Sequence, residues 1–323
     1  MSRSPESVTK TYHRDTYPAI SPTKPSLSQA GRAVLITGGG GGIGFEIARS
    51  FAKASASKVI IVGRRGPVLD AAAAKLREEF KGSPTEFLTR QGDIGDDEFI
   101  SSLWDFLNSQ NIFVRVLVLN AAHVTPFGPD TLKLDKRDIM EAFNVNVGGN
   151  FQMTVKFVNQ ALRPAGQQLN LINVSTAGIH MIPSPNQTTY TTTKAAFTTL
   201  VGRIADEHPV EDIQIISYHP GAIYSEGASK VVDKGLLNWD EFALPADYAV
   251  WAASPEASWL HGRFVWAHWD VDELKADENI AKLLEQEKGF LRVAVQGLSE
   301  VNIKAMLTQS NQNEPTWIKP SPK

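Results

Sequence analysis

The sequence contains no cysteine among its 323 residues. Disulfide bonds, cysteine-ligated zinc and thiol catalysis are therefore excluded. It also lacks an apolar run of about 18 residues, the length that a helix needs to cross a membrane, so we expect no membrane span. The sequence also lacks a large excess of one charge, because it has 32 basic and 35 acidic residues. We therefore expect no nucleic-acid partner, since that function requires a basic surface.

The rest of the composition is that of an ordinary globular protein, with 42% hydrophobic and 21% charged residues. The N-terminal stretch lacks the apolar core of a secretory signal, and the C-terminal tripeptide is not a peroxisomal signal, so a cytoplasmic location is the default expectation. Residues 1–31 are rich in Pro, Ser and Thr and predict an extended arm. The arm is either loose or packed along the core through Tyr12, Tyr17 and Ile20.

From residue 32 onward, short apolar runs alternate with segments of helical periodicity. The predicted strands are Ala33–Thr37, Lys58–Val62, Phe87–Arg90, Val114–Leu119, Leu169–Val174, Ile213–Tyr218 and Gly262–Ala267. The predicted helices are Ile43–Ala54, Val68–Phe80, Asp96 or Asp97 to Leu107, Asp135–Leu162, Thr189–Glu207 and Asp272–Lys288. Such alternation predicts an α/β fold, a doubly wound, Rossmann-like parallel sheet of about seven strands. We expect one catalytic domain over 32–270 and a partly helical C-terminal extension over 271–323.

A glycine-rich loop, Thr37-Gly-Gly-Gly-Gly-Gly-Ile43-Gly44, joins the first predicted strand to the first predicted helix. Glycines allow a sharp turn and let a pyrophosphate approach the N–H groups at a helix N-terminus. The strand before the loop and the helix after it indicate a dinucleotide site. Its predicted cofactor-binding residues are Gly38, Gly42, Ile43 and Gly44.

The end of the second strand predicts which dinucleotide binds. NAD-binding folds usually place Asp or Glu there to bind the ribose 2′-hydroxyl. This chain has Gly63, Arg64 and Arg65 instead. An arginine can bind the 2′-phosphate of NADP with two parallel hydrogen bonds, so we expect NADP(H) as the cofactor and Arg64 as its main contact. The alternative is a solvated arginine pair in a loop.

The catalytic chemistry is predicted from Tyr190 and Lys194, which lie four positions apart and so on one face of a helix. A phenol with a pKa of about 10 is a weak base near neutrality, and a neighbouring ammonium lowers that pKa. Ser175 follows the fifth predicted strand, where ligands of open α/β sheets bind, and its hydroxyl can donate to a substrate oxygen. Thr176 is the alternative for that role.

The T-G-x-x-x-G-x-G spacing at Thr37–Gly44 and the Y-x-x-x-K at Tyr190–Lys194 resemble the short-chain dehydrogenase/reductase family, in its single-domain branch. The resemblance covers about residues 32–270, and the arm and the tail look most like those of fungal members, many of which serve secondary metabolism. It implies that Tyr190 exchanges a proton with the substrate and that Lys194 also holds the cofactor ribose. We expect no metal site.

The resemblance extends to further cofactor contacts. Asp93 resembles the family residue that binds adenine, although a turn or helix-cap role is the alternative. The segment Asn120-Ala121-Ala122 resembles the family's N-N-A-G motif, with Ala122 in place of its glycine. The loop after the sixth strand resembles the segment over the nicotinamide, which implies contacts from Pro220, Gly221, Ile223 and Ser225.

Asn146 resembles the family's helix asparagine, which holds a water in a proton relay to the lysine. Asn144 competes for this role, because the helix register decides which of the two side chains faces the site. His123 and His219 adjoin the motifs, and we expect them to be structural.

The sequence thus predicts an NADP(H)-dependent oxidoreductase acting on a carbonyl or secondary alcohol of an apolar small molecule. Leu236, Leu237, Trp239 and Phe242 lie in a predicted substrate flap over 224–244, although they could equally pack the flap on the core. The family resemblance implies a homodimer or homotetramer. The alternatives are a redox-neutral or epimerising family member and a catalytically silent NADP-binding protein.

Overall fold

The computed structural model describes residues 8–124, 130–184, 187–229 and 232–295. Its sheet has the strand order β3-β2-β1-β4-β5-β6-β7, and all neighbouring strands pair in parallel. The strands are β1 Ala33–Thr37, β2 Lys58–Gly63, β3 Glu86–Gln91, β4 Val114–Leu119, β5 Leu169–Val174, β6 Ile213–His219 and β7 Arg263–Trp266. The predicted doubly wound α/β fold is confirmed.

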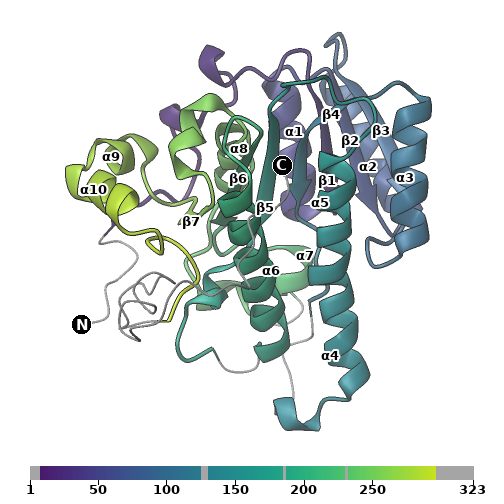
Figure 1. The fold of residues 1–323 in the computed structure, drawn as a ribbon. Coiled ribbons are helices and arrows are strands. Elements are labelled where there is room, and N and C mark those ends of the chain that lie inside the picture. The colour runs from purple at the N-terminus through teal and green to yellow at the C-terminus, as the bar shows by residue number, and fades with distance from the viewer. Residues whose placement is uncertain (1–7, 125–129, 185–186, 230–231, 296–323) are drawn as a thin grey trace, which may run out of the picture.

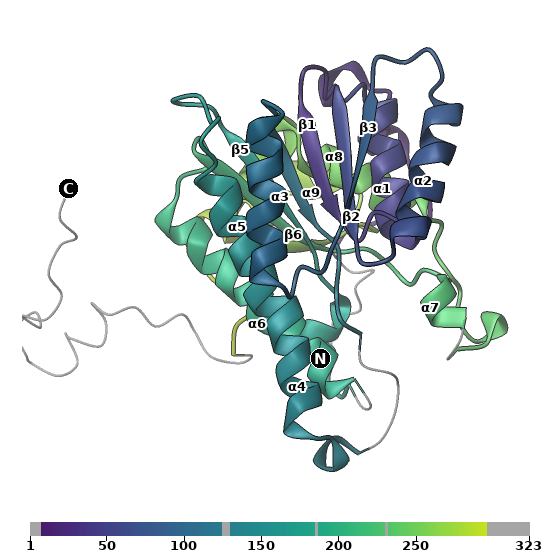
Figure 2. The same cartoon turned by 90° about the vertical axis from the view of Figure 1, so that its right-hand side faces the viewer.

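Helices cover both faces of the sheet (Figures 1 and 2). One hydrophobic core lies under α1, α2 and α8, and the other lies under α3, α5 and α6. The helices are α1 Gly42–Lys53, α2 Gly66–Glu79, α3 Asp97–Ser109, α4 Lys136–Phe143, α5 Asn150–Val158, α6 Thr188–Glu207, α7 Glu226–Ser229, α8 Ala243–Ala252, α9 Val271–Ala276 and α10 Glu278–Gln286. No helix within the described ranges is long and apolar enough to cross a membrane.

The apolar runs of the strands serve both cores, because successive side chains of a strand point to opposite faces. In β1, Val34 and Ile36 enter one core, whereas Leu35 enters the other. Burial on both faces explains why these strands read as continuous apolar runs rather than as alternating patterns.

The N-terminal arm packs along the core from residue 8 to residue 31, which decides between the two predicted alternatives. Ile20 is fully buried, and the Tyr17 hydroxyl donates to the carbonyl oxygen of Trp269 at 2.9 Å. The backbone N–H groups of Lys10 and Thr11 donate to the Glu273 carboxylate on α9. Figure 1 shows the arm, in purple, beside α9, although the two are far apart in the sequence.

Two helix predictions were wrong in detail. The predicted helix Asp135–Leu162 contains a π-helical segment, Asn144–Gly149, between α4 and α5, and it ends at Val158. The predicted helix Asp272–Lys288 is two helices, because Asp277 has an extended backbone and its side chain caps α10. Residues 296–323 of the predicted C-terminal extension lie outside the described residues.

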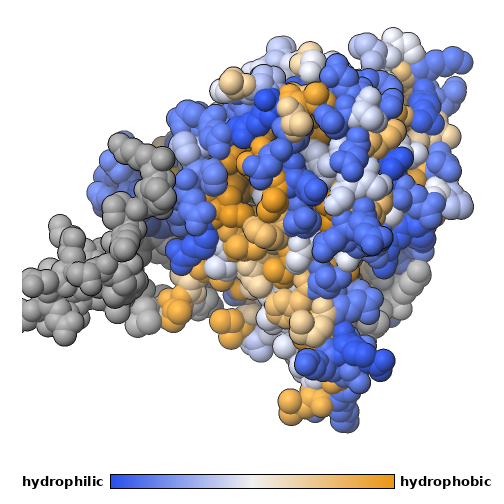
Figure 3. Space-filling view, turned by 45° about the vertical axis from the view of Figure 1, so that its right-hand side comes forward, coloured by the Kyte–Doolittle hydropathy of each residue, from blue (hydrophilic) through white to orange (hydrophobic). Residues whose placement is uncertain are grey.

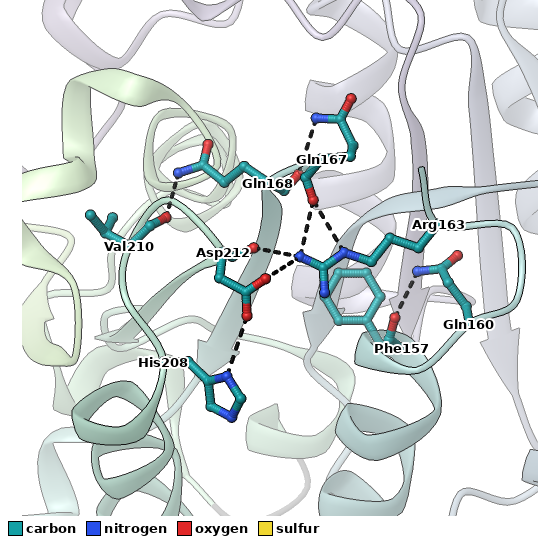
Figure 4. Close-up of polar contacts among 8 residues, drawn as sticks. All are labelled: Phe157, Gln160, Arg163, Gln167, Gln168, His208, Val210 and Asp212. Atoms are coloured by element: carbon teal, nitrogen blue, oxygen red, sulfur yellow. Dashed lines mark hydrogen bonds and ion pairs between the residues drawn. The ribbon is translucent and has the colours of Figure 1, made fainter. Parts of the chain in front are cut away.

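The amino edge of the sheet is held by a polar network (Figure 4). Arg163, after α5, donates to the Asp212 carboxylate at 2.5 Å and to the carbonyl oxygen of Gln167 at 3.0 Å. His208, after α6, lies 3.3 Å from the same carboxylate. These bonds tie the ends of α5 and α6 to the starts of β5 and β6, at the edge opposite to the glycine loop.

Candidate active site

The carboxyl edge of the sheet contains a cleft of about 460 Å³, at the point where the strand order reverses between β1 and β4. Ligands of open α/β sheets bind at this position. The loops after β1, β2, β3, β4 and β6 contribute to the cleft. Seven predicted cofactor-binding residues line it: Gly38, Gly42, Arg64, Asp93, Asn120, Ala121 and Ser225.

A close backbone contact shapes the glycine loop between β1 and α1. A Cβ atom added at Gly44 would lie 2.2 Å from the carbonyl oxygen of Gly38, so only glycine fits there. Gly41, at the N-cap of α1, has no side chain to cap the helix, and a Cβ atom built on it would meet no atom within 4 Å. Gly41 and Gly42 line the cleft, so the N-terminus of α1 lies at the cleft, where the helix dipole favours an anion. The loop fits the pyrophosphate of a dinucleotide.

Asn120 and Thr37 brace this loop against the end of β4. The Asn120 amide donates to the carbonyl oxygens of Thr37 at 3.0 Å and of Gly38 at 3.4 Å. In return, the Thr37 hydroxyl accepts from the backbone N–H groups of Asn120 and Ala121, each at 3.0 Å. The sequence reasoning did not include Thr37 among the site residues, although it opens the glycine motif.

Arg64 and Asp93 form an ion pair in the lining of the cleft, with 3.7 Å between Nη1 and Oδ2. The other carboxylate oxygen of Asp93 accepts from the backbone N–H of Gly95 at 2.9 Å. Asp93 therefore has the turn role that was its alternative interpretation, and it also lines the cleft. Both side chains are partly exposed, so the pair contributes little to stability.

Tyr190 and Lys194 lie in the first two turns of α6, one helical turn apart. The Lys194 ammonium is buried and donates to the carbonyl oxygen of Val174 at 2.7 Å. Burial lowers the Lys194 pKa to about 8 and raises the Tyr190 pKa to about 12. The expected lowering of the tyrosine pKa is thus absent in the polypeptide alone, because desolvation dominates at both groups.

Asn146 is fully buried in the π-helical segment and joins three parts of the site. Its side-chain oxygen Oδ1 accepts from the His123 backbone N–H at 2.7 Å. Its side-chain Nδ2 donates to the His123 carbonyl oxygen and to the Thr193 hydroxyl, each at 2.9 Å. Asn144 instead donates outward to the carbonyl oxygen of Gly95 at 2.8 Å. The register therefore places Asn146, not Asn144, next to α6.

Ser175 follows β5, and its side chain points to α6. Its hydroxyl lies 2.7 Å from that of Thr198, and the residue is 2% exposed. The Thr176 hydroxyl accepts from the backbone N–H of Gly178 at 3.2 Å, as a cap of the short turn that follows. Ser175 is therefore anchored to the helix that carries Tyr190, whereas Thr176 is occupied by its own loop.

The loop after β6 brings Pro220–Ser225 to the same edge of the sheet. Ser225 reaches the cleft, and its hydroxyl accepts from the backbone N–H of Ala228 at 3.2 Å. Gly221 has a φ of +103°, in the left-handed region that favours glycine. The remaining predicted cofactor contacts lie outside the lining of the cleft: Ile43, Gly44, Tyr190, Lys194, Pro220, Gly221 and Ile223.

The two histidines beside the motifs differ in their surroundings. His123 lines the cleft, and Asn146 holds its backbone. Burial, together with the neighbouring His268, lowers the His219 pKa to about 3, so this ring is neutral near pH 7. Within the described ranges, no three His, Asp or Glu side chains are grouped so as to hold a metal ion.

A family model described as short chain dehydrogenase matches residues 32–235. The chain belongs to this family. The dehydrogenase is 33% identical over 291 residues to the short chain dehydrogenase/reductase nsrO of Aspergillus novofumigatus, and the match covers 89% of this chain and 96% of nsrO. It is also 33% identical over 288 residues to AacuD of Aspergillus aculeatus, with 89% and 96% covered. The predicted likeness to fungal members is confirmed.

A solved structure shares the fold of the dehydrogenase. The L-sorbose reductase of Gluconobacter frateurii, in complex with NADPH and L-sorbose, matches with a TM-score of 0.66 at 20% identity. The match covers 75% of this chain and 96% of the reductase.

The dehydrogenase also contains site residues that sequence reasoning missed. Thr193 links Asn146 to α6, and Thr198 holds Ser175. Both could have been found from their positions, because Thr193 follows Tyr190 by three residues and Thr198 follows Lys194 by four. Asp240, which binds the loop after β6, lies in no motif and gave no such signal.

Proposed function

We propose that the dehydrogenase is an NADP(H)-dependent oxidoreductase that transfers a hydride between the nicotinamide and a carbonyl or secondary alcohol of an apolar small molecule. The observation that carries this proposal is the position of Tyr190 and Lys194. Both lie on α6, which the Lys194 ammonium ties to the end of β5, at the same sheet edge as the glycine cleft.

The glycine loop and Arg64 support NADP(H) as the cofactor. In this proposal, the N–H groups at the start of α1 hold the pyrophosphate, and Arg64 binds the 2′-phosphate at the end of β2, where an acidic residue would favour NAD. The bound nicotinamide supplies or accepts the hydride. The other proposed cofactor contacts are Asp93, Asn120, Ala121, Tyr190, Lys194, Pro220, Gly221, Ile223 and Ser225.

The protein's own groups account for the proton transfer. Because burial raises the Tyr190 pKa to about 12, the phenol is protonated near pH 7 and is ready to donate to a developing alkoxide. Ser175 donates a hydrogen bond to the same substrate oxygen. Lys194 binds the cofactor ribose and places a positive charge beside Tyr190. Asn146 keeps the proton path to water aligned.

Exposed apolar side chains around the site support an apolar substrate. Val124, Met181, Ile182, Leu236 and Leu237 are large hydrophobic residues on the loops after β4, β5 and β6, and all are exposed. Leu236 is 72% exposed, so it does not pack the flap on the core. An apolar ligand that covers these side chains would remove them from water.

Apolar surface on α4 and α5 supports a homodimer or homotetramer. Met140 on α4 and Phe151 on α5 are exposed, and Figure 3 shows hydrophobic surface running down the middle of this face between hydrophilic borders. Such a patch is typical of an interface between subunits. The resemblance to fungal relatives supports a role in secondary metabolism, and we propose a cytoplasmic location.

A ketone panel tests the proposal. NADPH oxidation should be faster with bulky apolar ketones than with sugar-like ketones, and NADH should replace NADPH poorly. Leu236→Ser should raise KM for the apolar ketones roughly tenfold, because it removes an apolar contact. Val295→Ser, at an exposed position in the tail, is the matched control. Binding of NADPH without turnover of any ketone would favour the silent-binder alternative.

A further inference from the structure

The carboxylate of Asp240 is buried where three distant parts of the chain meet, and its side chain is 1% exposed. Its Oδ1 accepts from Arg14 of the N-terminal arm at 3.0 Å. Its Oδ2 accepts from Nε2 of His268, after β7, at 2.8 Å, and from the backbone N–H of Ala222, in the loop after β6, at 2.7 Å. The mechanism proposed above uses the loop after β6 but gives no role to Asp240, Arg14 or His268.

The arm reaches Asp240 through more than one contact. Arg14 also donates to the carbonyl oxygen of Asn238 at 2.8 Å, and its own carbonyl oxygen accepts from the Glu241 N–H at 2.8 Å. The neighbouring Tyr12 ring stacks on His268 with 4.5 Å between ring centroids. The arm thus holds both Asp240 and its histidine partner.

His268 completes the pairing from the other side. The imidazole is 1% exposed, and its Nε2 must carry the proton in order to donate to the carboxylate. Burial alone would raise the Asp240 pKa, but the hydrogen bonds and charges of His268, together with Ala222 and Arg14, outweigh it and hold the pKa below its ordinary value. Asp240 is therefore a paired, ionised group in a buried place, where loss of one partner is expensive.

The loop after β6 is fastened to this cluster in two directions. The Asp240 N–H donates to the Ala222 carbonyl oxygen at 2.8 Å, which makes the backbone contact reciprocal. A Cβ atom added at Gly221 would lie 2.7 Å from Oδ2 of Asp240. The carboxylate therefore fits against the loop backbone, and the same loop continues to Ser225 on the cleft.

We propose that Asp240, held by Arg14 and His268, is a positioning residue that fixes the loop over 220–225 before the cofactor binds, so that the N-terminal arm is part of the cofactor site. The inference rests on the proposed function. A loop that is already ordered does not lose conformational freedom on binding, and its affinity for a ligand is higher for that reason. Loosening the cluster should weaken contacts at the nicotinamide end and spare the adenosine end at Arg64.

Calorimetric titration with two nucleotides separates these ends. NADPH reaches both, whereas 2′,5′-ADP carries only the adenosine half with its 2′-phosphate. Arg14→Gln and Asp240→Asn should weaken NADPH binding about tenfold and change 2′,5′-ADP binding less than about twofold. The matched control is Thr16→Val, which removes a hydrogen bond of 2.6 Å between the arm and Asp247 on α8 but leaves Asp240 untouched. It should bind both nucleotides as the wild type does.

Hydrogen exchange of the nucleotide-free protein provides a readout that is independent of binding. Arg14→Gln should speed exchange over 221–225 about tenfold and leave β6 protected, and Thr16→Val should not. Arg14 is 40% exposed, so this variant is suitable even if Asp240→Asn does not fold. Unchanged exchange and NADPH affinity in Arg14→Gln, or equal losses for both nucleotides, would overturn the inference. A wild type that binds neither nucleotide would refute the proposed function instead.

Discussion

The ammonium group of Lys194 donates a 2.7 Å hydrogen bond to the carbonyl oxygen of Val174, one residue before Ser175. This bond joins the helix that carries Tyr190 to the strand end that carries the second hydroxyl of the proposed mechanism. It also leaves a buried positive charge with a neutral partner. The site is therefore arranged for function at the expense of stability.

Lys194→Met should stabilise the protein near pH 7 and abolish activity. The folded-state pKa is lowered from 10.5 to about 8. Below pH 8 the lysine is charged in both states, and the folded state bears the desolvation penalty, so removal of the charge should raise the free energy of unfolding by about 1–3 kcal/mol.

Between pH 8 and 10.5 the unfolded state binds more protons than the folded state, so wild-type stability rises relative to the variant and the difference shrinks. Urea unfolding at pH 7 and pH 10 measures both effects. Lys75→Met, at an exposed position on α2, is the control and should change stability by less than about 0.5 kcal/mol. A Lys194→Met variant that is less stable at pH 7 would count against a buried, poorly compensated charge.

Arg64→Gln should lower the preference for NADPH over NADH. In the proposed complex, removing the guanidinium deletes a charged contact to the 2′-phosphate, which is worth about 1.5–3 kcal/mol, or more than tenfold in the NADPH affinity. NADH affinity should change little. The measurement is a titration with both nucleotides, and Arg137→Gln at the start of α4 is the exposed control. The same loss in Arg65→Gln but not in Arg64→Gln would move the assignment by one residue.

Alanine variants of Asn146 and Asn144 compare how much a buried and an exposed asparagine contribute to the free energy of unfolding. Asn146→Ala removes three hydrogen bonds from a fully buried side chain and leaves the His123 N–H and C=O without partners, so it should lower the free energy of unfolding by about 2–4 kcal/mol. Asn144→Ala should lower it by less than about 1 kcal/mol. Equal losses in urea unfolding would show that the helix register differs from the one described.

Ser175→Ala and Thr176→Val test which hydroxyl assists the reaction. Ser175→Ala should lower kcat by about a hundredfold or more, because the proposed donor to the reacting oxygen is lost, with little change in NADPH affinity. Thr176→Val should mainly loosen the turn after β5 and lower kcat less than about tenfold. Steady-state kinetics with one good ketone compare the two. The reverse order would assign the role to Thr176.

Most of the sheet could be predicted from the sequence because parallel strands are buried on both faces. The runs Val114–Leu119 and Leu169–Val174 match β4 and β5 to the residue. The helix α8 was missed because all but one of its residues, Ala243, are buried, so it has no polar face and no helical period. The π-helical segment was also missed, because a widened turn leaves no mark in an apolar pattern.

The residues of the candidate site also fall into those that could be predicted from the sequence and those that could not. Residues within short motifs, such as Tyr190 and Lys194, could be named because their spacing carries the chemistry. Partners that meet only through the fold could not be named, and Asp240 and His268 are the clearest case, since 28 positions separate them and neither lies in a motif. The pKa of Tyr190 could not be predicted either, because desolvation depends on the burial of the folded helix.

Tyr190 is the proposed proton donor in an NADPH-dependent reduction. The most direct measurement is the loss of NADPH absorbance with apolar ketones at pH 7, for the wild type beside Tyr190→Phe, with NADPH affinity measured in both. We expect turnover in the wild type and a rate at least about a hundredfold lower in the variant, with similar NADPH affinity. Turnover that survives in Tyr190→Phe would contradict this role.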